Sequence, residues 1–227
     1  MTLQRLPKSL IFALICVLFV GSGMAESMAH EVLEDFQSYP EGKAPSGEWK
    51  VRSGDPSQVY SIQKEDNNQF LRASDKGQSV QFFVKKKWSL TKYPCLQWKW
   101  RVHDFPEGAD ERNRSKNDSA AGIYVVFPKR WFIPDSIKYV WSTVAPVETV
   151  VRNHDRFPMK VVSTGTDAKG KWVTVERNVL EDYKTLFDRS PSSPVALGFL
   201  TDSNNVGGGA VADYDDLRAT TCSDSAK

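Results

Sequence analysis

The segment Cys95-Leu96-Gln97-Trp98-Lys99-Trp100-Arg101-Val102-His103 decides the fold class, because its side chains alternate between apolar and polar. Successive side chains of a β-strand point to opposite faces, so a period of two predicts a strand with one face in the core and the other exposed. Trp98 and Trp100 belong to the apolar set and are expected in the core. The polar set then lies on an exposed sheet face.

Short alternating or β-branched runs continue on both sides of this segment, separated by clusters of Gly, Pro, Asn and Asp. About a dozen such runs follow one another from Val32 to Ala219, at the spacing typical of a sandwich or barrel. One helix interrupts them: Asn178 is placed to cap it, Glu181 completes a capping box, and Pro191 follows its end. The sequence predicts an all-β fold, an antiparallel β-sandwich of jelly-roll type with one short helix at its edge.

The first 25 residues have the pattern of a secretory signal peptide. Arg5 and Lys8 precede an apolar run over residues 10–20, and small residues lead to Ala25, where cleavage is expected; Ala29 offers a second cleavage point. The run is too short to span a bilayer comfortably, and no later segment is apolar for long enough. We therefore expect a periplasmic or secreted protein without a transmembrane anchor after cleavage, and a single β-sandwich domain over residues 30–222.

The charge balance argues against binding of nucleic acid. The chain has 30 Lys and Arg against 28 Asp and Glu, and Arg5 and Lys8 account for the whole excess. An electrostatic nucleic-acid binder needs a clustered basic surface, which a balanced exported chain does not indicate.

Two cysteines, Cys95 and Cys222, lie outside the signal peptide. An oxidising compartment favours a disulfide between them, which would tie the C-terminal tail to an interior strand. The alternative is a buried free Cys95 and an unpaired Cys222.

Acidic residues near both ends of the exported chain indicate a structural calcium ion. Glu34 and Asp35 lie near the first predicted strand, and Asp215 and Asp216 lie in the last one. Calcium prefers six to eight oxygen ligands, which carboxylates from two distant segments and loop carbonyls can supply. Adjacent strand residues face opposite sides, so only one of Asp215 and Asp216 is expected to bind unless a bulge intervenes. The alternative is a set of solvated acids at strand ends.

Several side chains have the chemistry for binding a polysaccharide, which needs flat apolar platforms beside hydrogen-bonding groups, and cations if the sugar is anionic. The polar and cationic set consists of Lys99, Arg101 and His103. The candidate platforms are Tyr124, Trp131, Tyr139 and Trp141, and Trp131, in a loop, is the best candidate for exposure. Aromatic side chains of a sandwich otherwise belong more often to the core.

The sequence has no nucleophile elbow, phosphate loop or metalloprotease helix. An active site would therefore have to be assembled from residues that form no known motif. The candidates are Arg101, His103, Tyr139 and Asp182, acting on a polysaccharide in a cleft covered by the polar loop 104–118. Two or three of these groups in one pocket would favour an enzyme, whereas an open face lined by aromatic rings would favour a binding protein.

Several strings taken together resemble an exported bacterial family known as domain of unknown function 3047. They include Trp98–Val102, Gly122–Phe127, Tyr139–Ser142 and Asp213–Leu217. The resemblance covers nearly the whole exported chain and implies a periplasmic or secreted protein, but no activity and no catalytic residues. It also implies an architecture similar to concanavalin-like and galactose-binding-like sandwiches, folds that serve binders, hydrolases and lyases alike.

The leading hypothesis is a non-catalytic, carbohydrate-binding or cell-envelope-associated protein, with a polysaccharide or another envelope glycan as its partner. One alternative is a polysaccharide-active enzyme, either a lyase or a glycoside hydrolase. The other is a structural envelope protein without a small ligand.

Overall fold

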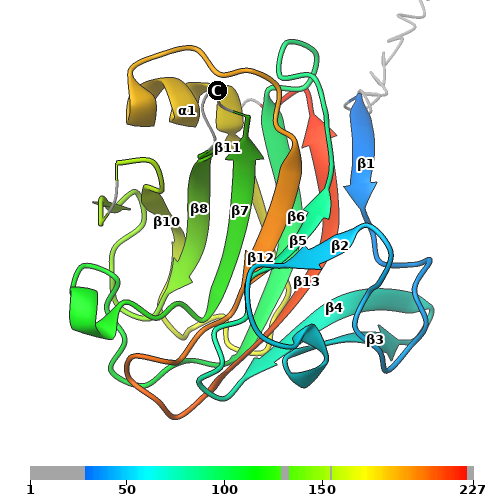
Figure 1. The fold of residues 1–227 in the computed structure, drawn as a ribbon, viewed down its shortest axis with the longest axis vertical. Coiled ribbons are helices and arrows are strands. Elements are labelled where there is room, and N and C mark those ends of the chain that lie inside the picture. The colour runs from blue at the N-terminus through cyan, green and yellow to red at the C-terminus, as the bar shows by residue number, and fades with distance from the viewer. Residues whose placement is uncertain (1–28, 129–132, 154, 224–227) are drawn as a thin grey trace, which may run out of the picture.

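Two β-sheets pack face to face in the computed structural model, which describes residues 29–128, 133–153 and 155–223 (Figure 1). The first sheet has the strand order β11-β6-β13-β4-β3, and β1 also pairs with β13. Its strands are β1 (His30–Glu34), β3 (Tyr60–Glu65), β4 (Asn68–Asp75), β6 (Cys95–Asp104), β11 (Val173–Asn178) and β13 (Ala210–Thr220).

The second sheet has the order β2-β5-β12-β7-β8-β10-β9. Its strands are β2 (Trp49–Val51), β5 (Phe82–Lys85), β7 (Ala121–Phe127), β8 (Asp135–Ser142), β9 (Val150–Val151), β10 (Met159–Thr164) and β12 (Ala196–Leu200). Two short 3-10 turns, Pro56–Gln58 and Arg114–Lys116, and the helix α1 (Val179–Phe187) complete the described elements.

The predicted alternation of the segment 95–103 is confirmed. It forms β6, whose apolar set, including Trp98 and Trp100, is fully buried between the sheets. β6 pairs with β11 on one side and β13 on the other, so it is an interior strand of its sheet. The apolar face of β6 therefore anchors the core of the sandwich.

One strand pair departs from the antiparallel arrangement: β10 runs parallel to β8. A parallel neighbour needs a crossover connection, and the segment between Ser142 and Met159 provides it. This segment includes β9, which pairs antiparallel with β10. A small second core on the outer side of this part of the sheet includes Val140, Ala145 and Val151.

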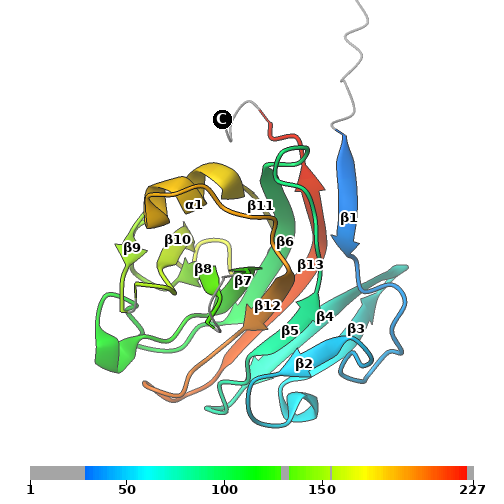
Figure 2. The ribbon, with the colours of Figure 1, turned by 45° about the horizontal axis from the view of Figure 1, so that its top comes forward.

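The helix forms where its capping residues predict it. The side chain of Asn178 accepts a hydrogen bond from the Glu181 backbone N–H at 3.1 Å, and the helix ends at Asp188 in a left-handed conformation. Val179, Tyr183 and Leu186 are buried on one face of α1. Figure 2 shows that α1 lies across one end of the sandwich.

The disulfide prediction is confirmed, because Cys95 and Cys222 are bonded, with their Cα atoms 5.1 Å apart. The bond joins the start of β6 to the chain just after β13. The predicted signal peptide lies outside the described residues and stays a prediction. Within the described part of the chain, no helix is long and apolar enough to cross a membrane.

Candidate functional site

A row of side chains crosses the outer face of the second sheet. Lys50, Phe83, Gly198, Tyr124 and Lys138 are successive register partners on β2, β5, β12, β7 and β8. Their immediate strand neighbours belong to the core between the sheets, except Val51 at the end of β2, which is exposed. Because side chains alternate along a strand, this row faces away from the core.

The ring of Phe83 lies directly on the backbone of Gly198. A Cβ atom added to Gly198 would be only 2.3 Å from Cε1 of Phe83, a distance that real Cβ atoms essentially never show. The ring of Tyr124 is next to it, with centroids 5.8 Å apart and an angle of 48° between the planes. A glycine at this position therefore lets one aromatic ring rest on the sheet beside a second ring.

These two half-buried rings form the floor of an open groove of about 570 Å³. Most of its walls are apolar, and no carboxylate is among its lining residues, which are Arg52, Gln81, Phe83, Tyr124, Val126, Ile133, Pro134, Ser136, Phe157 and Ala196. Phe157 belongs to the crossover between β8 and β10, so this connection walls the groove on one side. The site has the composition of a ligand site, with apolar surfaces and a few polar groups.

A smaller hollow of about 240 Å³ adjoins the groove and shares Tyr124 with it. Lys138 and Asp202 are nearly buried there, with Nζ 3.9 Å from Oδ1. Asp202 also accepts a hydrogen bond from the Ser119 backbone N–H at 2.8 Å. Burial raises the pKa of Asp202 to about 6, although Lys138 acts in the opposite direction. This end of the groove thus holds a buried ion pair that can take up a proton in mildly acidic solution.

The cations predicted on β6 lie on the outer face of the other sheet. Arg101 and His103 converge with Arg72 on the fully buried carboxylate of Asp213: Nε of each arginine lies 2.7–2.9 Å from a carboxylate oxygen, and Nε2 of His103 lies 2.7 Å from Oδ2. The Arg101 guanidinium also lies 4.5 Å from the ring centroid of Trp172. Arg101 and His103 of the predicted set therefore meet here, together with Arg72, which was not predicted. Lys99 pairs instead with Asp216, and Arg101 is buried rather than exposed.

Two of the predicted platforms are core residues, which corrects the prediction. Tyr139 and Trp141 are 0% and 1% exposed, because they share the inward face of β8. Tyr139 donates a hydrogen bond to Asp182 at 2.9 Å. Tyr124 is the predicted platform that lines the groove, and Trp131 lies outside the described residues.

The four carboxylates predicted to bind calcium each have other partners. Glu34 accepts a hydrogen bond from Tyr39, Asp35 from the Gln37 backbone and Asp215 from Asn68, and Asp216 pairs with Lys99 at 2.7 Å. A bulge does occur here, since the register shifts between Asp215 and Arg218 and Asp216 has a φ of 51°. In the described residues, no group of three or more His, Cys, Asp or Glu could hold a metal ion. The calcium site stays a prediction.

The sequence did not single out Phe83 or Gly198. The run Phe82-Phe83-Val84 is apolar throughout, so alternation gives no contrast between its two faces. Gly198 lies inside an apolar strand, and an isolated glycine there indicates close approach of another group. The glycine thus indicates a close contact, but the sequence around it does not identify Phe83 as the contacting residue.

Comparison with solved structures finds proteins of low identity, several of them carbohydrate-binding modules. A family 11 carbohydrate-binding module from Clostridium thermocellum, in complex with a β-1,3-1,4-mixed-linked tetrasaccharide, is 12% identical, with 85% of this chain and 95% of that chain covered and a TM-score of 0.41. A family 29 carbohydrate-binding module from Piromyces equi is 11% identical, with 88% and 95% covered and a TM-score of 0.37. An arabinose-bound α-L-arabinofuranosidase, MgGH51, is 12% identical over 85% of this chain and 27% of that chain, with a TM-score of 0.42. At these scores the similarities do not identify a ligand for this chain.

No curated protein sequence matches the chain. A family model does match, over residues 47–218, and its description is "Protein of unknown function (DUF3047)". The match covers most of the chain and confirms the resemblance noted from the strings of β6, β7, β8 and β13. The chain belongs to the DUF3047 family.

Proposed function

We propose that this protein is a non-catalytic, carbohydrate-binding protein that holds a polysaccharide chain in the groove on the outer face of its second sheet. The observation that carries the proposal is the pair of rings, Phe83 and Tyr124, on a floor opened by Gly198. Flat rings beside hydrogen-bonding groups match the apolar faces and hydroxyls of sugar rings. Gln81 and Ser136 supply such groups in the groove wall.

A binding role is favoured over an enzyme because the proposed catalytic groups are separated. Arg101 and His103 lie on the outer face of the first sheet with Asp213, whereas Tyr139 and Asp182 form a buried contact. None of these four lines the groove. An open face with aromatic rings supports the binder.

The signal sequence supports a place outside the cytoplasm. Residues 1–25 have the pattern of an export signal, and we propose that the protein is periplasmic or secreted and associates with a glycan of the cell envelope or the surroundings.

Affinity electrophoresis against a panel of neutral and acidic polysaccharides tests the proposal. Wild-type protein should be retarded by at least one polymer, and Phe83→Ala and Tyr124→Ala should each weaken binding about tenfold, the effect of losing roughly 1.4 kcal/mol of ring contact. Trp172→Ala is the matched control, because this half-exposed ring precedes β11 of the first sheet.

Retardation that is lost in Trp172→Ala and kept in Phe83→Ala would move the site to the other face. No retardation by any polymer would favour the structural envelope protein. Release of shortened or unsaturated sugars by the wild type would instead show an enzyme.

A further inference from the structure

We propose that the groove takes an acidic polysaccharide, one whose uronate carboxylates meet a row of cations along the β2 and β5 side of the groove. This inference rests on the proposed function and adds the chemical class of the ligand. It comes from three side chains that the fold places beside the aromatic floor: Lys50, Arg52 and Lys85.

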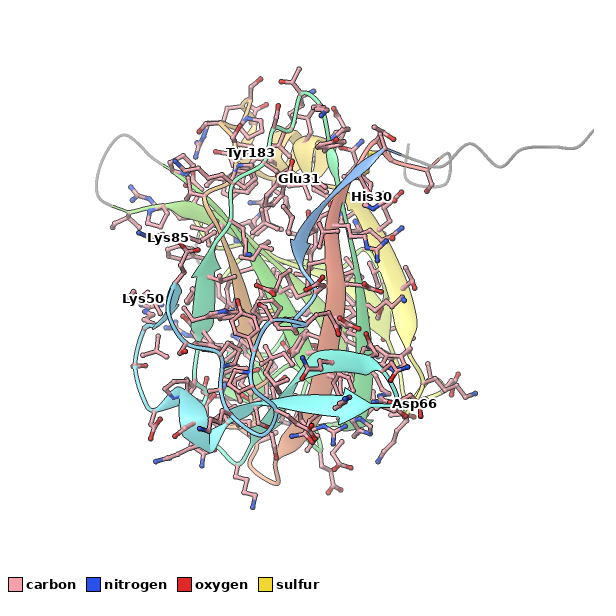
Figure 3. All side chains as sticks on the ribbon, turned by 90° about the vertical axis from the view of Figure 1, so that its right-hand side faces the viewer. His30, Glu31, Lys50, Asp66, Lys85 and Tyr183 are labelled. Atoms are coloured by element: carbon pink, nitrogen blue, oxygen red, sulfur yellow. A yellow bond between two sulfur atoms is a disulfide. The ribbon has the colours of Figure 1, made fainter. Side chains whose placement is uncertain are left out.

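The backbone ladder fixes where these cations lie. Lys50 is the register partner of Phe83, and Lys85 is the partner of Ala196, which lines the groove. The Arg52 backbone N–H donates to the carbonyl of Gln81 at 3.2 Å, so Arg52 extends the same ladder. Figure 3 shows Lys50 and Lys85 near each other on one side of the molecule. By the alternation of side chains along a strand, all three point to the same outer face as Phe83.

These cations have no carboxylate partner within the described part of the chain. All three are exposed, and no ion pair of the described residues includes any of them. The side chain of Arg52 donates a hydrogen bond to the amide oxygen of Gln81 at 3.5 Å. By contrast, Lys99 on the first sheet is paired with Asp216.

The charge at the groove is therefore positive. Among its described lining residues, Arg52 is a cation and none is a carboxylate. The carboxylate of the adjoining hollow, Asp202, is beside Lys138. Unpaired cations along one border of a carboxylate-free groove complement an anionic chain, and the guanidinium of Arg52 can hold a carboxylate with two parallel hydrogen bonds.

A uronate chain would use both parts of this surface. The apolar faces of its sugar rings can rest on Phe83 and Tyr124 while its carboxylates turn toward β2. A neutral glycan could accept hydrogen bonds from the three cations but would form no ion pair with them. Lysines on an edge strand such as β2 also discourage pairing between sheets, but that role predicts no dependence of glycan binding on charge.

The test uses polygalacturonate and alginate, each beside its carboxyl-reduced, neutral counterpart, with binding measured by calorimetry at low and high salt. We expect the acidic polymer to bind at least tenfold more tightly than the reduced one, and more weakly at high salt. The triple variant Lys50→Gln, Arg52→Gln and Lys85→Gln should lower affinity for the acidic polymer about tenfold or more.

The matched control makes the same change of charge elsewhere. Lys43, Lys64 and Lys171 are exposed: Lys64 lies on β3, the Lys43 carbonyl bonds to β3, and Lys171 precedes β11 of the first sheet. Their triple replacement by glutamine should leave affinity within twofold of wild type.

The outcomes separate this inference from the proposed function. Equal binding of acidic and reduced polymers, with loss in Phe83→Ala, would overturn the acidic ligand and keep the groove. Equal loss in the control triple variant would also overturn it, because the attraction would then come from net charge. Failure of every polymer to bind would remove the proposed function itself.

Discussion

Substitution of Gly198 by alanine will push the Phe83 ring off the second sheet. The new Cβ would lie 2.3 Å from Cε1 and 2.5 Å from Cδ1 of the ring. Gly198 does not have a positive φ, so the backbone accepts alanine without strain. The three heavy atoms nearest to the new Cβ all belong to this ring, so the ring is what the substitution must displace.

The expected magnitude follows from two opposed effects. Alanine in a strand is favoured over glycine by about 0.5–1 kcal/mol, because glycine loses more conformational freedom on folding. Forcing a methyl group into a packed contact costs about 1–3 kcal/mol. Gly198→Ala should thus destabilise the wild type by about 0–2.5 kcal/mol and stabilise the Phe83→Ala variant by about 0.5–1 kcal/mol.

The assay is urea unfolding of four proteins: wild type, each single variant and the double variant. The coupling free energy between the two positions should be on the order of 2 kcal/mol. Glycan affinity of the same proteins should fall in Gly198→Ala as it does in Phe83→Ala, with no further loss in the double variant. If Gly198→Ala changes stability equally in both backgrounds, the ring does not lie on Gly198 and the groove floor is wrong.

Three further predictions concern stability. Replacing Cys95 and Cys222 by serine should lower the free energy of unfolding by about 5 kcal/mol on the loop-entropy model, since the two cysteines are 127 residues apart in sequence. A loss below about 1 kcal/mol in thermal unfolding would contradict the entropic account. Asp213→Ala should cost about 3–5 kcal/mol in urea unfolding, because it leaves the arginines around it without their buried carboxylate, and a change within error would show that the network is not stabilising. Burial raises the pKa of Asp202 to about 6, above its value in the unfolded chain. The folded state therefore binds this proton more tightly, and the free energy of unfolding falls as pH rises from about 4 to 6. Asp202→Asn should flatten this part of the pH profile, and an unchanged slope would exclude Asp202 as its source.

The elements that depend on local spacing could be predicted. The alternation of β6, the cap of α1 by Asn178 and the class of fold all follow from periods and residue types within a few positions of one another. The compartment that the signal sequence indicates and the number of cysteines favoured a Cys95–Cys222 bond over free cysteines, and the structure decides for the bond.

The role of the β6 cations could not be predicted from their own strand. Arg101 and His103 do point to the outer side of the sheet, as alternation requires, but Arg101 is buried there. Asp213 of β13 lies opposite Arg101 in the sheet and binds both. The partner of a strand and its register are set by contacts far apart in sequence.

The sequence by itself predicted the sandwich and its helix, and it offered the disulfide as one of two alternatives. Only the tertiary structure decided which face carries the groove. Phe83, Gly198 and Tyr124 come from three different strands, and their meeting depends on the register of β5, β12 and β7. A shift of one residue in any of these pairings would turn that strand's outward side chains into the core, and no local pattern of residues records that choice.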